Sequence, residues 1–196
     1  MHADPILIEL PASLHTARLL MRPPQAGDGA MVCAAVTESL PELRRFLASL
    51  PWVASDPTPE TSEIWCRNAM ANFIARKDMP FLLLDKTAGS TPVMVGVVGL
   101  HRPVWTTPKF EVGYWVRTRF AGKGFVSEGV NALTEMALAQ LRAARVELIT
   151  DEDNAPSRRV AQRCGYTLEG TLRNERRAPD STLRHTCIYA RTAPLA

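Results

Sequence analysis

The chain has 196 residues, of which 46% are hydrophobic and 22% are charged, and its formal net charge is +3. This length and composition suit one domain with a full core, so we expect a single domain over residues 1–196 with its core at about 14–191. The weak charge neither demands nor excludes a nucleic-acid partner, but the sequence has no basic helix with interleaved aromatics, so we expect none. No apolar run approaches the ~20 residues of a membrane span, and the first residues lack the basic start of a signal peptide, which favours a cytoplasmic protein with no membrane partner.

The N-terminal half predicts a strand followed by helices. The expected elements are a strand at 14–22, a helix at 29–37, a second helical segment from Ser39, and a third helix from Pro59 to about Arg76. Asp28 and Thr58 are suitable N-caps, and Ser39 with Glu42 fits a capping box. The apolar residues expected to be buried in the third helix are Ile64, Trp65, Phe73 and Ile74.

The second half alternates strands and helices less regularly. The expected strands are Phe81–Leu84, Val93–Leu100, Phe110–Val116, Val146–Thr150, 166–170 and 183–191, with helices after Gly124 and over 156–163. Because strands and helices are neither segregated nor strictly alternating, the order predicts an α/β protein with a mixed sheet flanked by helices.

The cysteines and histidines are scattered along the sequence. Cysteines at 33, 66, 164 and 187 form no Cys-x-x-Cys pair and are better explained as buried small apolar residues. The four histidines are equally dispersed, so we predict no metal site.

The run from Arg119 to Gly124 joins an apolar strand to an amphipathic helix and contains two glycines. Glycine frees the backbone to bend and leaves no Cβ between the amides and a ligand. The first amides of a helix lack intrahelical partners and lie at the positive end of its dipole, so this turn suits a phosphate or pyrophosphate. A plain tight turn remains the alternative. The spacing matches neither a dinucleotide fingerprint nor a nucleoside-triphosphate loop.

The pattern Arg-x-x-Gly-x-Gly at 119–124 resembles the acetyl-coenzyme A loop of the GNAT superfamily of N-acetyltransferases. The preceding Glu111–Val116 strand is similar to that of the RimJ/RimL-like branch, which acts on ribosomal-protein N-termini. Further motifs that resemble this branch, in the same order along the chain, are Thr16–Arg22, Asn154–Ser157, Cys164–Tyr166 and Glu169–Arg173.

The resemblance implies the GNAT fold, a single mixed sheet that is splayed at its centre. Acetyl-CoA would be the cosubstrate, with its pantetheine arm between the splayed strands. Val116 and its neighbours would pair with the arm, and Asn154 would hydrogen-bond it, although a turn role for Asn154 is the alternative. The amides of Arg119, Ala121, Gly122, Lys123 and Gly124 would receive the pyrophosphate, and the side chains of Arg119 and Lys123 would add positive charge unless they are simply solvated.

Acetyl transfer to an amine needs a base, and the resemblance points to Glu111 for that role. An exposed strand carboxylate is the alternative, and Glu169 and Glu175 are lesser candidates. Many GNAT enzymes protonate the leaving thiolate with a tyrosine at a position that is Ala161 here. Ser157 is the hydroxyl that the RimL-like branch offers instead, with a helix-start cap as its alternative role.

The acceptor would be an amine on a protein N-terminus or a small molecule. It would enter near Trp52 and residues 173–183, where arginines (44, 45, 173, 176 and 177) would favour acidic groups unless they only form a solvated face. A longer acyl donor such as succinyl-CoA and a non-catalytic CoA-binding homologue stay open as alternative functions. The protein is expected to be a monomer or homodimer.

Overall fold

The computed structural model describes residues 4–48, 50–178 and 180–193. It contains an eight-stranded sheet with the order β1-β2-β3-β4-β5-β6-β8-β7. The strands are β1 (Leu14–His15), β2 (Leu19–Arg22), β3 (Met79–Asp85), β4 (Val93–Val104), β5 (Lys109–Val116), β6 (Arg145–Asp151), β7 (Thr167–Arg177) and β8 (Leu183–Thr192). The helices are η1 (Pro5–Leu7), α1 (Gly29–Leu47), α2 (Pro51–Ala54), α3 (Pro59–Ile74), η2 (Thr118–Phe120), α4 (Phe125–Ala139) and α5 (Ala155–Arg163).

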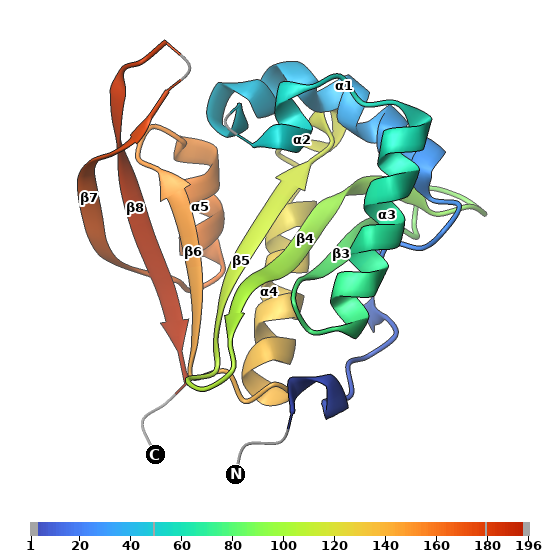
Figure 1. The fold of residues 1–196 in the computed structure, drawn as a ribbon, viewed down its shortest axis with the longest axis horizontal. Helices are drawn as coiled ribbons and strands as arrows, with labels where there is room; N and C mark the ends of the chain where they lie inside the picture. The colour runs from blue at the N-terminus through green and yellow to red at the C-terminus, as the bar shows by residue number, and fades with distance from the viewer. Residues whose placement is uncertain (1–3, 49, 179, 194–196) are drawn as a thin grey trace.

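Helices cover both faces of the sheet, and each face has its own core (Figure 1). On one face, Val130 and Leu133 of α4 pack against Val112 and other strand residues. On the other, Val36 of α1 packs with Trp115 of β5. We call these the α4 face and the α1 face. The mixed sheet predicted from the sequence is confirmed.

The sheet splits between β5 and β6, which run parallel to each other. Their pairing stops after Glu111 and Glu147, although β5 continues to Val116 and β6 to Asp151. Beyond that point β6 keeps its other neighbour, β8, while β5 keeps β4. The facing edges of the two strands therefore diverge, and Figure 1 shows the wedge opening toward α2.

Two predictions for the N-terminal half were wrong. The strand expected at 14–22 is two short strands, β1 and β2, and the two helical segments expected between 29 and 50 are one helix, α1, which contains Pro41. Proline removes one backbone hydrogen bond, but the buried face of α1 continues past it through Leu40 and Leu43. Ser39 is no cap. Its buried hydroxyl donates to the Ala35 carbonyl at 2.7 Å.

The third helix begins as predicted but packs through a different face. The Thr58 side chain and Thr61 form a capping box at the start of α3. Ile64 and Ile74, which were expected to be buried, are exposed, and Trp65 is half-buried. Phe73 is buried as predicted, and the helix packs through it together with Cys66 and Ala69. The four cysteines are buried free thiols, as predicted.

The last two strands are longer than predicted. β7 extends to Arg177, so that much of the stretch expected to be a loop at 173–183 is strand.

Asp28 precedes α1 but makes no side-chain cap hydrogen bond, because its carboxylate pairs with Arg22 at 2.6 Å.

Candidate active site

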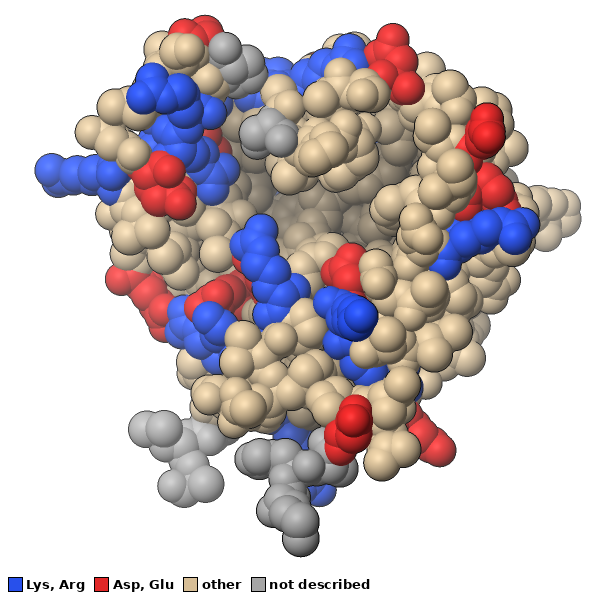
Figure 2. Space-filling model, viewed as in Figure 1, with Lys and Arg blue, Asp and Glu red and all other residues tan. Residues whose placement is uncertain are grey.

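A cleft of about 1490 Å³ occupies the wedge between β5 and β6. It is lined from both faces of the sheet, by α1 and α2 on one side and by the start of α4 and α5 on the other. Figure 2 shows the hollow at the centre of one face of the molecule, with uncharged residues covering most of its floor and basic side chains at its rim. All of the predicted site residues except Arg119 and Lys123 line this cleft.

The glycine turn closes one end of the cleft. Gly122 and Gly124 have φ values of +75° and +81°, in the left-handed region that side chains with a Cβ rarely adopt. The first hydrogen bond of helix α4 runs from the Glu128 amide to the Gly124 carbonyl, at 3.0 Å. Within the described structure, the amides at the start of α4 thus lack helical partners and lie at the positive end of the helix dipole, a site suited to an anion.

An ion pair fixes this turn to the rest of the sheet. Arg18 forms a salt bridge with Glu128 at 2.6 Å and donates to the Lys123 carbonyl at 2.9 Å. Thr16 also donates to Glu128, at 2.5 Å. Burial alone would raise the pKa of Glu128, but hydrogen bonds from Thr16 and Arg18 lower it below its usual range. The predicted opening strand therefore supports the glycine turn.

Two basic side chains stand at the turn. Arg119 and Lys123 both lie against the ring of Phe120, at 5.4 and 5.1 Å from its centre. Arg119 is also within 3.4 Å of Glu38 and remains about half exposed. Ala121 lies between them and lines the cleft. Both charges therefore lie beside the glycine turn, with that of Arg119 shared with Glu38.

The side chains of β5 alternate between the two faces of the sheet. Tyr114 and Val116 pack with the α4 core, and Trp115 packs with the α1 core. By the same alternation Glu111 lies on the α1 face. The cleft therefore connects the face that carries the glycine turn to the face that carries the Glu111 carboxylate.

Glu111 is half-buried at the narrow end of the wedge, where β5 and β6 separate. It forms an ion pair with Arg102, which has a φ of +47° beside a bulge in β4. Burial raises the pKa of Glu111 above its usual range, while Arg102 and His101 oppose the rise. A carboxyl with a raised pKa is a better base near neutral pH.

Ser157 and Tyr114 form a hydroxyl pair on the α4 face. Their oxygens are 2.8 Å apart, and the Tyr114 hydroxyl also donates to the Ser157 carbonyl at 3.3 Å. Asn154 is the N-cap of α5 and accepts from the Ser157 amide at 3.1 Å, so the cap is Asn154 rather than Ser157. Sequence reasoning missed Tyr114, although it lies within the strand that was singled out.

Trp52 is on α2, above the α1 face. Its ring lies 6.2 Å from that of Trp115, and 38% of the residue is exposed. Arg44, one of the arginines expected at the acceptor site, instead binds the carbonyl of Val53 at 3.1 Å and Asp56 at 2.7 Å. Arg44 therefore holds α2 in place.

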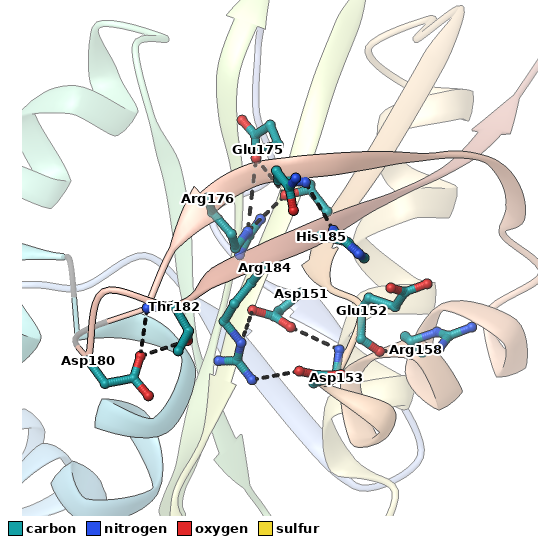
Figure 3. A network of polar contacts seen from close by, with 12 residues as sticks. Asp151, Glu152, Asp153, Arg158, Glu175, Arg176, Asp180, Thr182, Arg184 and His185 are labelled. Atoms are coloured by element: carbon teal, nitrogen blue, oxygen red, sulfur yellow. Dashed lines mark hydrogen bonds and ion pairs between the residues drawn. The ribbon is translucent and has the colours of Figure 1, made fainter.

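The β7–β8 hairpin lines the cleft on the β6 side, and Figure 3 shows its polar contacts. Arg184 bridges Asp151 at 3.3 Å and Asp153 at 3.1 Å. Glu175 accepts from the Thr186 hydroxyl at 2.5 Å. Glu169 pairs with Arg145 at 2.5 Å, in agreement with a structural role. The Arg184 contacts fix the hairpin against the last residue of β6, and the Glu169–Arg145 pair fixes it against the first.

Comparisons with known proteins agree with this geometry. The family model described as "Acetyltransferase (GNAT) domain" matches residues 18–167, more than half of the chain. The chain belongs to the GNAT acetyltransferase family. The family, the GNAT fold, the enzyme class and acetyl-CoA as cosubstrate, all expected from the sequence, are thereby confirmed.

Individual relatives of this GNAT protein fit the predicted RimJ/RimL-like branch. The ribosomal-protein-serine acetyltransferase of Escherichia coli (strain K12) is 30% identical over 41% of this chain and 45% of that enzyme. The uncharacterized N-acetyltransferase p20 of Bacillus licheniformis is 24% identical over 85% of this chain and 88% of its own length. The structure of RimL, a ribosomal L7/L12 α-N-protein acetyltransferase, in complex with coenzyme A matches with a TM-score of 0.80 and 19% identity, over 90% of this chain and 95% of RimL.

The match to the E. coli enzyme covers less than half of that relative. Its ribosomal acceptor is therefore a property of that enzyme, and the acceptor of this GNAT protein is a separate question. Among the described residues, no group of three or more His, Cys, Asp or Glu is placed to hold a metal ion. No helix in the described ranges has both the length and the apolar character to cross a membrane.

Proposed function

We propose that this GNAT protein transfers the acetyl group of acetyl-CoA directly to the α-amino group of a protein, a peptide or a small molecule. The observation that carries the proposal is the cleft through the sheet, which has an anion-binding turn on one side and Glu111 on the other. The pyrophosphate would bind at the amides of the glycine turn, and the open edge of β5 near Val116 would pair with the pantetheine arm. The amine would enter from the α1 face, past Trp52.

The reaction needs a neutral amine and a stabilised leaving thiolate. An α-amino group, with a pKa of about 7.7–8.0, loses its proton far more easily than lysine at about 10.4. Glu111 takes a proton from the nitrogen, and the carbon–sulfur bond breaks as the amide forms. Ser157, whose hydroxyl is hydrogen-bonded to that of Tyr114, would hydrogen-bond the sulfur as it leaves. The side chain of Asn154 orients this region through the start of α5.

Removing either hydroxyl of the Ser157–Tyr114 pair is expected to slow turnover about tenfold, which corresponds to about 1.4 kcal/mol of transition-state stabilisation. Ser157→Ala and Tyr114→Phe should have similar effects, because Tyr114 acts by orienting Ser157. The double variant should therefore be little slower than either single variant, as measured by release of the CoA thiol. If the losses multiply, or if only thermal stability changes, the pair has no joint role in the reaction.

The acceptor class is tested with a panel of amines, after calorimetric titration has confirmed acetyl-CoA binding. Peptides with a free α-amine should be acetylated faster than the same peptides offering only a lysine side chain. Trp52→Ala should raise the Michaelis constant for the acceptor several-fold and leave acetyl-CoA affinity unchanged, because the ring lies on the α1 face. A panel in which only polyamines, aminoglycosides or lysine side chains react contradicts the α-amine preference.

The same panel separates the alternative functions. Faster reaction with succinyl-CoA than with acetyl-CoA would reassign the donor. Tight CoA binding without thiol release on any amine would indicate a CoA-binding homologue without catalysis. We further propose that the protein acts in the cytoplasm as a monomer or homodimer. Light scattering on the purified protein tests which of these two assembly states it has.

A further inference from the structure

A histidine–aspartate pair lies beside Glu111 and has no role in the mechanism above. His101 of β4 is the direct cross-strand partner of Glu111, so the two side chains share the α1 face. The Nδ1 atom of His101 is 2.5 Å from an oxygen of Asp78, which precedes β3. Both residues line the cleft.

The hydrogen bond to Asp78 fixes which ring nitrogen is free. A carboxylate oxygen accepts hydrogen bonds, so Nδ1 carries the proton of the neutral ring and Nε2 has a lone pair. The aspartate thereby orients the ring and would stabilise the imidazolium formed when Nε2 takes a proton. This is the arrangement by which a histidine serves as a general base in other enzymes.

Two glycines make room for the ring. A Cβ added at Gly113 would lie 2.8 and 2.9 Å from the Cδ2 and Nε2 atoms of His101, and one added at Gly99 would lie 3.0 Å from Nε2. A Cβ at Gly113 would be too close to the ring, and one at Gly99 would be in very tight contact with it, so the ring lies directly against the backbone of β4 and β5. Gly113 follows Glu111 and belongs to the part of β5 that β6 has left. The lone pair of Nε2 is therefore held at the wedge, where the reacting groups would meet.

Two protons leave the nitrogen during the proposed reaction. The acceptor enters mostly as an ammonium and must lose one proton before it attacks the thioester carbon. After the attack, the positively charged nitrogen carries one proton more than the amide product. It loses this second proton as the carbon–sulfur bond breaks and the amide forms. One base can take both protons only if it releases the first before the second leaves the nitrogen.

We propose that His101, oriented by Asp78, takes the first of these protons at Nε2, which leaves Glu111 to take the second. This inference rests on the proposed acetyl transfer and names a second base for it. After the transfer, the imidazolium returns its proton to water, because the His101 side chain is 34% exposed, and the proton taken by Glu111 balances the leaving thiolate, which is released as the thiol. Asp78 is a positioning residue that acts through the ring.

Other charged groups around the pair bear on its pH dependence. Arg102 and Glu111 lie next to His101 on β4 and β5, and Glu147 of β6 and Arg176 of β7 also act on Glu111. Lys109 is 3.6 Å from Glu147 and partly neutralises it. Because these charges surround both bases, the test compares acceptors of different basicity as well as different pH values.

The decisive variant is His101→Gln. With an α-amine peptide, its kcat/KM should fall about a hundredfold at pH 7, the lower end of the usual effect of a general base. The loss should shrink toward pH 9, because the free amine then needs no deprotonation before attack. With aminoacetonitrile, a weakly basic primary amine that is already neutral at pH 7, His101→Gln should equal the unchanged protein.

Asp78→Asn should show the same pattern with a smaller loss, since the amide preserves the volume but no longer fixes the tautomer. His15→Gln, which removes an exposed histidine on β1, is the matched control and should change neither profile. Thermal unfolding and acetyl-CoA titration establish that each variant is folded.

The inference is overturned if His101→Gln and Asp78→Asn match the unchanged protein with the α-amine peptide at pH 7. Equal losses on both acceptors at every pH overturn it as well, since they indicate a structural role. In both of these cases the unchanged protein still acetylates amines and the proposed function stands. If the unchanged protein acetylates no amine, the proposed function fails and this inference fails with it.

Discussion

Glu111→Gln is expected to lower turnover by ~10²–10⁴ at neutral pH, the usual scale for the loss of a general base, with little change in acetyl-CoA affinity. Glutamine keeps the shape of the side chain and loses the ability to take a proton. The measurement is the steady-state release of the CoA thiol with an α-amine peptide, together with calorimetric titration of acetyl-CoA. Glu169→Gln is the matched control, because that carboxylate pairs with Arg145 and does not line the cleft.

The sign of the pH effect follows from the environment of Glu111. Burial raises the pKa of this carboxyl, and only the ionised form accepts a proton. Activity should therefore decline as the pH falls through the raised pKa, at a higher pH than for an ordinary glutamate near 4.3. Arg102→Gln removes the charge that opposes the rise, so the acid limb should move further toward neutral pH.

Full activity of Glu111→Gln across pH 6–9 would make Glu111 structural. Glu175 is then the next carboxylate to test, since it lines the same cleft and accepts a hydrogen bond from Thr186. A Glu175→Gln variant that loses activity while Glu111→Gln does not would transfer the role of base to β7.

The parts of the site that were predicted from the sequence are those with a local signal. The glycine turn has its signal in six consecutive residues, because the positive φ angles at Gly122 and Gly124 depend on residue type at those positions. The start of α3 was equally readable, since Thr58 and Pro59 act on neighbouring backbone amides. Local rules need no knowledge of the partner elements.

The residues that were missed depend on contacts between distant segments. Tyr114 meets Ser157 across 43 positions of the chain, and His101 meets Asp78 across 23. No spacing rule connects such pairs, because the sheet register and the docking of α5 bring them together. The exposure of Ile64 has the same origin, since the face that α3 buries is chosen by its neighbours and not by its own sequence.

For helix α1 the error is the opposite: local signals predicted a break in the helix that the structure does not have. Pro41 and the Ser39–Glu42 pair both favour a break. The break does not occur, because Leu40 and Leu43 bury their side chains on either side of the proline. The Ser39 hydroxyl then accepts a hydrogen bond from the Thr118 amide at 3.1 Å, which ties α1 to the segment just before the glycine turn.

Gly124→Val is expected to weaken acetyl-CoA binding by at least about tenfold, or about 1.4 kcal/mol. Gly124 has a φ of +81°, and a β-branched residue held there carries about 1–3 kcal/mol of strain. The turn would relieve that strain by changing its backbone angles, which would redirect the amides at the start of α4. A Cβ at this position would also lie 3.4 Å from the Arg18 guanidinium that holds the turn.

The control for strain alone is Gly89→Val. Gly89 also has a positive φ, +142°, but lies in an exposed turn between β3 and β4 that does not line the cleft. Both variants should unfold at a lower temperature than the unchanged protein, and only Gly124→Val should bind acetyl-CoA more weakly in a calorimetric titration. Gly122→Val should behave like Gly124→Val, because Gly122 also has a positive φ, +75°, and a valine there would strain the same turn. Unchanged affinity in a folded Gly124→Val protein would show that the pyrophosphate binds elsewhere, since no other described turn combines two left-handed glycines with the start of a helix.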